Sequence, residues 1–200
     1  MTGATASATK GGALPLRTIV VDGPLALKMR RLEAADANEL GVQILTLPQL
    51  AARLAGGFLR AASTEDLERA TRSALQAGEI LELAPLRDLP GMARATVRSL
   101  ERLWRAGYAL DGAREPARLA DLAQIADRVR ESLPGDVLAL PDLVAKAVTR
   151  ASLAPRVLGE VRLEAIHHTP PIWRPLLEAI AARAPLTWVG TPAPAGWPGA

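Results

Sequence analysis

Two short apolar runs near the start of the chain are each followed by a segment with helical periodicity. The first run, residues 17–22, ends at a Gly-Pro turn and precedes a helical pattern over residues 25–35. The second run, residues 41–46, precedes apolar residues at helical spacing that continue to about residue 61. Short apolar runs bounded by turn residues are typical of buried strands. This strand–helix–strand–helix order predicts a parallel sheet with right-handed crossovers.

The pattern changes at Ser63, where a hydroxyl residue followed by acids is typical of the start of a helix. From there to residue 155 the sequence predicts an all-helical insertion. Its clearest predicted helices span residues 91–106, 115–133 and 141–151.

Strand character returns after this insertion. Residues 161–166 and 186–190 are predicted strands, and residues 172–184 between them are a predicted helix. We therefore predict an α/β core made of residues 17–62 and 156–190, interrupted by the helical insertion.

The two ends of the chain have a different composition. Residues 1–12 are small and polar, and we expect residues 1–16 to be flexible. Residues 191–200 are rich in proline and glycine, and we expect this tail to lack packing contacts of its own. From the tail we expect the chain to be the leading part of a longer protein.

Composition limits the chemistry that the chain can perform. Of its 200 residues 49% are hydrophobic, only six are aromatic and none is cysteine. Disulfides, thiolate metal sites and cysteine nucleophiles are therefore excluded, and a core of Leu, Ala, Val and Ile favours helices. The first residues lack the apolar centre of a signal peptide, and no apolar run is long enough to cross a membrane. We expect a cytoplasmic protein that does not associate with membranes.

Arginine dominates the basic residues: 21 of the 24 are arginine, and the lysines are Lys10, Lys28 and Lys146. The guanidinium group suits two-point contact with phosphate. A solvated surface that reflects coding bias is the alternative explanation.

The predicted helix over residues 91–106 separates its side chains into two sets at about 100° per residue. One narrow apolar stripe contains Ala93, Val97, Leu100 and Trp104. A row of positively charged residues lies to the side of this stripe and contains Arg94, Arg98, Arg102 and Arg105. Glu101 falls between the two sets. Such a row is a candidate track for a nucleic-acid backbone. The alternative is a solvated face whose arginines pair with acids of neighbouring helices.

The net positive charge is concentrated around this helix. Residues 86–118 contain seven arginines and four acids, an excess that equals the +3 of the whole chain. Aromatic residues for base stacking are sparse there, because Trp104 lies on the apolar stripe and Tyr108 near the helix end.

The turn after the first strand stands where a nucleotide-binding protein carries its phosphate loop. That loop needs two glycines and a lysine followed by Ser or Thr. Here Gly23 is the only glycine, and Lys28 is followed by Met29. The predicted site is therefore a degenerate one.

The strand over residues 161–166 also lacks the residues that a nucleotide site needs. A helicase-type ATPase ends this strand with an acidic pair that holds magnesium. Here Glu164 lies within the strand, and His167 and His168 follow it. Adjacent histidines on an extended segment point to opposite sides, so they do not share a metal ion. We predict no catalytic set, no cofactor and no metal site.

Three segments, QILTLPQLAARL (43–54), LRDLPGMARA (86–95) and LERLWRAG (100–107), resemble the N-terminal part of AddB-type subunits. These subunits belong to the AddAB helicase-nucleases, which resect double-strand breaks for recombination. The likeness covers about residues 18–189. It implies a P-loop helicase-like domain, often without a functional ATPase, that carries a helical insertion.

The resemblance also implies site residues and partners. Thr46 matches a segment near single-stranded DNA, and residues 161–189 match a degenerate Walker B strand with the helix that follows it. The degenerate nucleotide site predicted from the motifs consists of Gly23, Lys28, Glu164 and His167. The implied partners are DNA, as a single strand or a duplex end, and a subunit of AddA type. The family's nuclease motif and iron–sulfur cysteines belong to a C-terminal domain, so no cutting activity is carried over to these residues.

We therefore expect a non-catalytic, DNA-binding scaffold region of a break-repair helicase-nuclease. Two alternatives stay open. One is a small α/β nucleotide hydrolase that uses Lys28 and Glu164. The other is a protein-interaction scaffold whose arginines pair with a partner's acids. The preferred DNA structure, nucleotide binding and the oligomeric state are not determined by the sequence.

Overall fold

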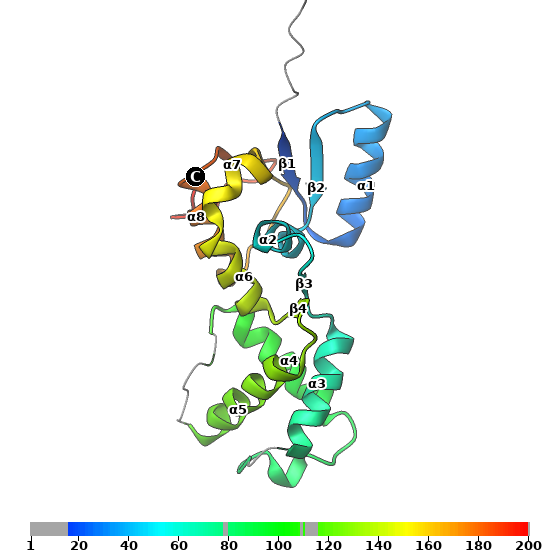
Figure 1. The fold of residues 1–200 in the computed structure, drawn as a ribbon, viewed down its shortest axis with the longest axis vertical. Helices are drawn as coiled ribbons and strands as arrows, with labels where there is room; N and C mark the ends of the chain where they lie inside the picture. Colours follow the sequence, from blue (N-terminus) through cyan, green and yellow to red (C-terminus); the bar gives the residue numbers. More distant parts are fainter. Residues whose placement is uncertain (1–15, 78–79, 109, 111–115, 200) are drawn as a thin grey trace, which may run out of the picture.

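The computed structural model describes residues 16–77, 80–108, 110 and 116–199. An α/β unit and a helical unit lie one above the other along the long axis of the molecule (Figure 1). Two short parallel strands, β3 (Arg60–Ala61) and β4 (Val137–Leu138), pair where the chain enters and leaves the helical unit.

The α/β unit is built on a parallel four-stranded sheet with the order β2-β1-β5-β6. Its strands are β1 (Arg17–Val20), β2 (Val42–Leu45), β5 (Glu160–Glu164) and β6 (Leu186–Val189). The predicted parallel sheet is therefore confirmed. β1 lies between β2 and β5. The chain therefore moves in one direction from β1 to β2 and in the other from β5 to β6, so the strand order reverses between β1 and β5. Ligands of such sheets bind outside the carboxyl ends of the strands at this point.

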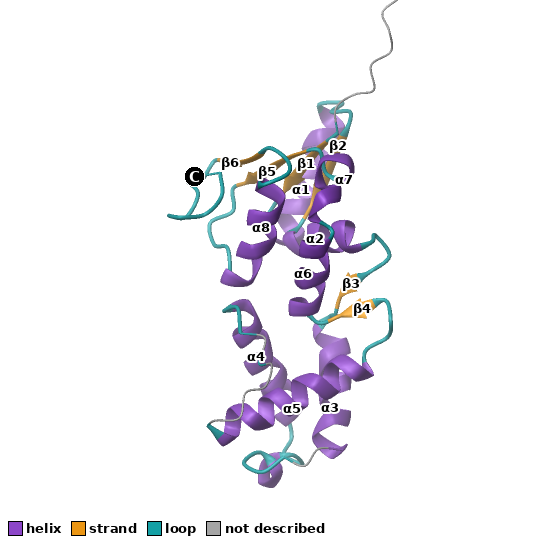
Figure 2. Ribbon diagram, turned by 60° about the vertical axis from the view of Figure 1, so that its left-hand side comes forward, coloured by secondary structure: helices purple, strands orange, loops and turns teal. Residues whose placement is uncertain are grey.

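Helices cover the two faces of the sheet unequally (Figure 2). On one face, α1 (Gly23–Asp36) packs on β1 and β2 through Leu27 and Ala34, which contact Ile19, Val21 and Ile44. The larger core lies on the other face, where the helices are α2 (Leu47–Ala55), α6 (Leu140–Thr149), α7 (Ala154–Val157) and α8 (Arg174–Ala181).

The sequence of β5 explains this asymmetry. It reads Glu-Val-Arg-Leu-Glu, and side chains alternate between the two faces of a strand. Val161 and Leu163 are fully buried in the larger core. The three charged residues of β5 therefore lie on the face of α1, where each is half-buried.

The helical unit has its own core, formed by α3 (Thr64–Ala77), α4 (Met92–Arg105) and α5 (Ala117–Ser132). The predicted start at Ser63 is confirmed, because the Asp66 N–H donates to Ser63 Oγ and the Ser63 N–H donates to Asp66 Oδ2. Buried Asp121 of α5 accepts the N–H groups of Leu81 and Leu83 at 3.0 and 2.8 Å. These bonds tie the connection between α3 and α4 to α5.

The segment after β4 packs with the α/β unit although it lies within the predicted insertion of residues 63–155. Leu143 and Ala147 of α6 are fully buried in the larger core, and α6 packs against α2. The 3₁₀ turn Ala151–Leu153 and α7 follow in the same core. The pairing of β3 with β4 brings the chain back to the α/β unit before α6 begins.

The expectation that the tail lacks packing contacts is wrong for residues 191–199. Trp197 packs edge-to-face on Trp188 of β6, with ring centroids 6.4 Å apart. The Trp188 Nε1–H donates to the Pro198 carbonyl at 2.9 Å, and Arg174 donates to the Gly196 carbonyl at 3.1 Å. A half-buried tryptophan needs an acceptor for its N–H, and the tail supplies it. The expectation for residues 1–16 falls outside the described residues except at Leu16.

Candidate nucleic-acid interface

The two predicted faces of α4 are both present in the structure. Val97, Leu100 and Trp104 are each 1% exposed and form part of the core of the helical unit. The opposite set is exposed along the whole helix: Arg94, Arg98, Arg102 and Arg105. The periodicity therefore gave the orientation of α4 correctly.

Among the described residues, an acid lies within ion-pair distance of only the first of these arginines. Arg94 Nε lies 3.6 Å from Glu68 Oε1, and the Arg94 side chain remains 66% exposed. Arg98, Arg102 and Arg105 form no ion pair with any residue that the structure describes. From Arg94 to Arg105 the row extends roughly 16 Å along the helix axis, at about 1.5 Å per residue.

The helix end gives part of this row a structural role as well. Arg102 and Arg105 stand in the last turn of α4. Cations there interact favourably with the helix dipole, by about 0.3–1 kcal/mol each at an exposed site. This interaction leaves the guanidinium groups open to solvent and available to a ligand.

A crevice of about 400 Å³ lies outside the carboxyl ends of β1 and β2. Its polar side chains come from four segments: Asp22 after β1, Thr46 after β2, His168 after β5, and Arg105 from the helical unit. The arginine row of α4 therefore ends at the crevice. The end of α4 reaches it because α4 contacts the 3₁₀ turn Pro171–Trp173.

Thr46 is fixed in the wall of this crevice by the start of α2. Its N–H donates to Gln49 Oε1 at 3.0 Å, and its carbonyl accepts the N–H of Leu50 at 2.8 Å. The structure thus brings together two residues, Thr46 and Arg105, that the sequence predicted as DNA contacts in separate segments.

Gly23 also lines the crevice, but its surroundings differ from those of a phosphate loop. Only Val21 and Asp22 lie between the end of β1 and the start of α1. Pro24 supplies no N–H, and the carboxylate of Asp22 stands beside the helix start, where a phosphate would bind. This turn is too short to surround a phosphate with amide groups.

The other residues of the predicted nucleotide site do not line this crevice. Lys28 lines a separate hollow on α1. Glu164 binds Arg30, with 3.0 Å between its Oε2 and the Arg30 Nε. His167 is exposed, and the neighbouring His168 is the histidine that lines the crevice. Glu164 ends β5, but its carboxylate binds Arg30, and neither Lys28 nor Glu164 lines the crevice.

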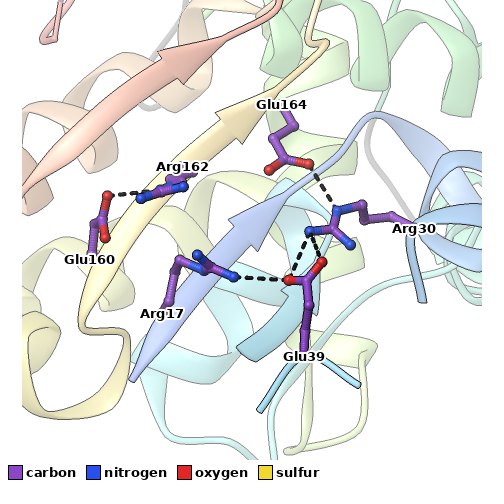
Figure 3. Close-up of polar contacts among 6 residues, drawn as sticks. All are labelled: Arg17, Arg30, Glu39, Glu160, Arg162 and Glu164. Carbon is purple, nitrogen blue, oxygen red and sulfur yellow. Dashed lines mark hydrogen bonds and ion pairs between the residues drawn. The ribbon is translucent and has the colours of Figure 1, made fainter. Parts of the chain in front are cut away.

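Glu164 instead belongs to a group of charged side chains on the α1 face of the sheet (Figure 3). Arg30 of α1 binds Glu164 and both carboxylate oxygens of Glu39, at 2.9–3.0 Å. Burial acts to lower the pKa of Arg30, but these hydrogen bonds outweigh it and raise that pKa. The group holds α1 against β5.

A second pair lies on the same face. Arg162 Nε and Glu160 Oε1 are 2.8 Å apart, and this bond raises the pKa of Arg162 and lowers that of Glu160. The alternation of charge in β5 was the sequence signal for this polar face.

Two polar residues of the crevice, Asp22 and His168, are not among the site residues predicted from the sequence. Their signal was positional, because Asp22 ends the expected strand over residues 17–22 and His168 lies two residues after the one over 161–166. The carboxyl ends of parallel strands meet at one edge of a sheet. Within the described ranges, no group of three or more metal-ligating side chains is present.

No helix among the described residues is both long enough and apolar enough to span a bilayer. Comparison with known proteins gives no family model that matches this sequence and no curated protein that matches it.

Proposed function

We propose that this chain binds DNA as a helicase-like region without nucleotide chemistry, in an AddB-type subunit of a break-repair helicase-nuclease. The observation that carries the proposal is the row of exposed arginines on α4. Three of them have no ion-pair partner among the described residues, and the row ends at the crevice beside Thr46.

The proposed mechanism is electrostatic. Arginines about one turn apart on α4 offer contacts to successive phosphates of an extended strand, and the strand continues into the crevice between the two units. Each neutralised phosphate of a single strand releases a bound cation, so the logarithm of the affinity falls with the logarithm of the salt concentration by about 0.7 per contact. Three or four contacts correspond to a slope of about −2 to −3.

The crevice supports binding without hydrolysis. The turn at the start of α1 lacks the amide groups of a phosphate loop, because it is short and Pro24 removes a backbone donor. Glu164 is occupied by Arg30. The proposed role in recombination and the proposed AddA-type partner rest on the resemblance of segments 43–54, 86–95 and 100–107.

Fluorescence anisotropy with a labelled oligo-dT strand, at salt concentrations from about 50 to 200 mM, tests the proposal. Changing Arg94, Arg98 and Arg102 together to Glu is expected to abolish binding, because it replaces the phosphate contacts with negative charges. The fold should stay intact, because these side chains are exposed. The matched control changes Arg53, Arg156 and Arg183 to Glu, which are exposed arginines of the α/β unit. It alters the net charge equally and is expected to retain most of the affinity.

Equal loss in both triple variants would show that net charge alone attracts the strand, and a response that does not change with salt would refute phosphate contact. The scaffold alternative predicts no DNA binding by the native chain and co-purification with an acidic partner. A hairpin with a free duplex end, measured beside oligo-dT, compares the two DNA forms.

A further inference from the structure

The two edges of the main sheet differ in what covers them. At β6, the tail lies against the strand, and the Trp188 side chain bonds to the Pro198 carbonyl. At β2, no described strand pairs with the outer side. The carbonyls of Gly41 and Leu45 accept N–H groups from the β1 side, at 2.9 and 3.0 Å. Because backbone groups alternate along a strand, those of Val42 and Ile44 point away from β1.

One side chain of α1 reaches this outer edge. Arg31 Nη2 donates to the Ile44 carbonyl at 3.1 Å. Arg31 also lines a hollow of about 390 Å³ on α1, together with Lys28 and three apolar residues, Pro24, Leu27 and Leu32. The hollow and the strand edge are therefore adjacent, and Arg31 belongs to both.

The surroundings of this edge are more apolar than those of a protected edge. Natural proteins shield edge strands with charges, prolines and bulges. Here the outer side of α1 exposes Leu25 at 73%, Met29 at 51% and Leu32 at 52%. Leu40, two residues before β2, is 74% exposed. Such side chains, at helical spacing beside an unpaired strand, are typical of an interaction surface.

We propose that the outer edge of β2, together with the adjacent hollow on α1, binds an extended, acidic segment of a partner protein by strand addition. Backbone groups of Val42 and Ile44 would supply the main-chain hydrogen bonds, and the hollow would accept an apolar side chain. Lys28 and Arg31 select for carboxylates next to that side chain. Arg31 exchanges a neutral carbonyl acceptor for a carboxylate, which forms the stronger bond.

The charges of α1 favour this occupant over a basic one. At about 100° per residue, Lys28 and Arg31 lie on the flank that borders the hollow. Glu33 falls on the other flank, about 120° from Leu27. This surface is separate from the arginine row of α4, so the inference does not depend on DNA binding.

The probe is a labelled peptide with the alternating sequence Glu-Val-Glu-Val-Glu-Leu-Glu, measured by anisotropy and by amide hydrogen exchange. Binding is expected, with slower exchange of the Val42 and Ile44 amides. The same peptide with N-methyl groups on alternate amides keeps its side chains but cannot pair as a strand. It is expected to lose at least tenfold in affinity.

Charge reversal tests the basic flank. The double variant Lys28→Glu with Arg31→Glu is expected to weaken peptide binding about tenfold or more. The single variant Lys28→Glu is expected to do the same, and it keeps the Arg31 bond to β2. The control pair, Arg53→Glu with Lys146→Glu, lies on α2 and α6 and is expected to bind as the native chain does. The inference is overturned by no binding of the acidic peptide, by equal binding of the N-methylated peptide, by unchanged exchange at Val42 and Ile44, or by equal losses in the reversed and control pairs.

Discussion

Asp66 gives the most direct test of how the helical unit is attached to the sheet. Its Oδ2 accepts the Ser63 N–H at 3.0 Å, the Ser63 hydroxyl at 2.8 Å and a guanidinium N–H of Arg60. Arg60 lies in β3, directly where the chain enters the helical unit. Replacing Asp66 with Asn keeps the size of the side chain and removes its charge.

The expected loss of stability follows from the helix cap that Asp66 forms with Ser63. Losing an N-terminal capping interaction costs about 1 kcal/mol, within a range of about 0.5–2. The Arg60 side chain is 50% exposed, so its ion pair with Asp66 is screened by solvent and adds little to the loss. We therefore expect Asp66→Asn to lower the free energy of unfolding by about 1–1.5 kcal/mol at pH 7.

The pH dependence has a definite sign. The hydrogen bond from Arg60, followed by those from Ser63, lowers the pKa of Asp66 well below its usual range. A lowered pKa in the folded state gives stability that is present above the unfolded pKa of about 3.9 and is lost as the pH falls toward the folded value. The loss is about 1.4 kcal/mol per pH unit, so most of the difference between the native chain and the variant should be gone by about pH 3.

Urea unfolding followed by circular dichroism, at pH 7 and at pH 3, measures both effects. Glu65→Gln is the control, because Glu65 is in the same first turn and its exposed pair with Arg69 contributes little. If the Asn variant were as stable as the native chain at pH 7, or if its deficit were as large at pH 3, the assigned role of Asp66 would be refuted.

Three further substitutions test other parts of the fold by thermal or urea unfolding. Gly159→Ala is expected to prevent stable folding or to cost more than about 3 kcal/mol, because a Cβ atom would overlap the Leu16 carbonyl oxygen at 1.8 Å and φ is +66°. Gly135→Ala has open space and should be neutral, so a tolerated Gly159→Ala would contradict the close approach. Arg30→Met should cost about 2 kcal/mol, since it breaks half-buried bonds to Glu39 and Glu164, whereas Arg69→Met breaks an exposed pair and should cost less than about 0.5. Equal effects of these two would show that the charged group does not hold α1 to β5. Trp197→Ala should cost about 1 kcal/mol and change the near-ultraviolet spectrum, because it removes the partner of the Trp188 ring; an unchanged spectrum would show that the tail is not packed there.

The sequence by itself determined the features that depend on local periodicity. The four strands of the main sheet lie within a residue or two of the expected runs, and α4 buries the apolar stripe that the spacing predicted. The cap at Ser63 formed as expected, because the residues that make it are three positions apart. In each case neighbours along the chain carry the information.

The tertiary structure alone decided which distant residues meet. Arg105 shares a crevice with Asp22, more than 80 residues away in the sequence, because α4 contacts the turn after β5. Glu164 pairs with Arg30, more than 130 residues away in the sequence, because β5 is placed beside β1. The packing of α6 and of the tail was missed for the same reason. Hydrophobic spacing shows that a face must be buried, but the element that covers it is set by the long-range arrangement of the chain.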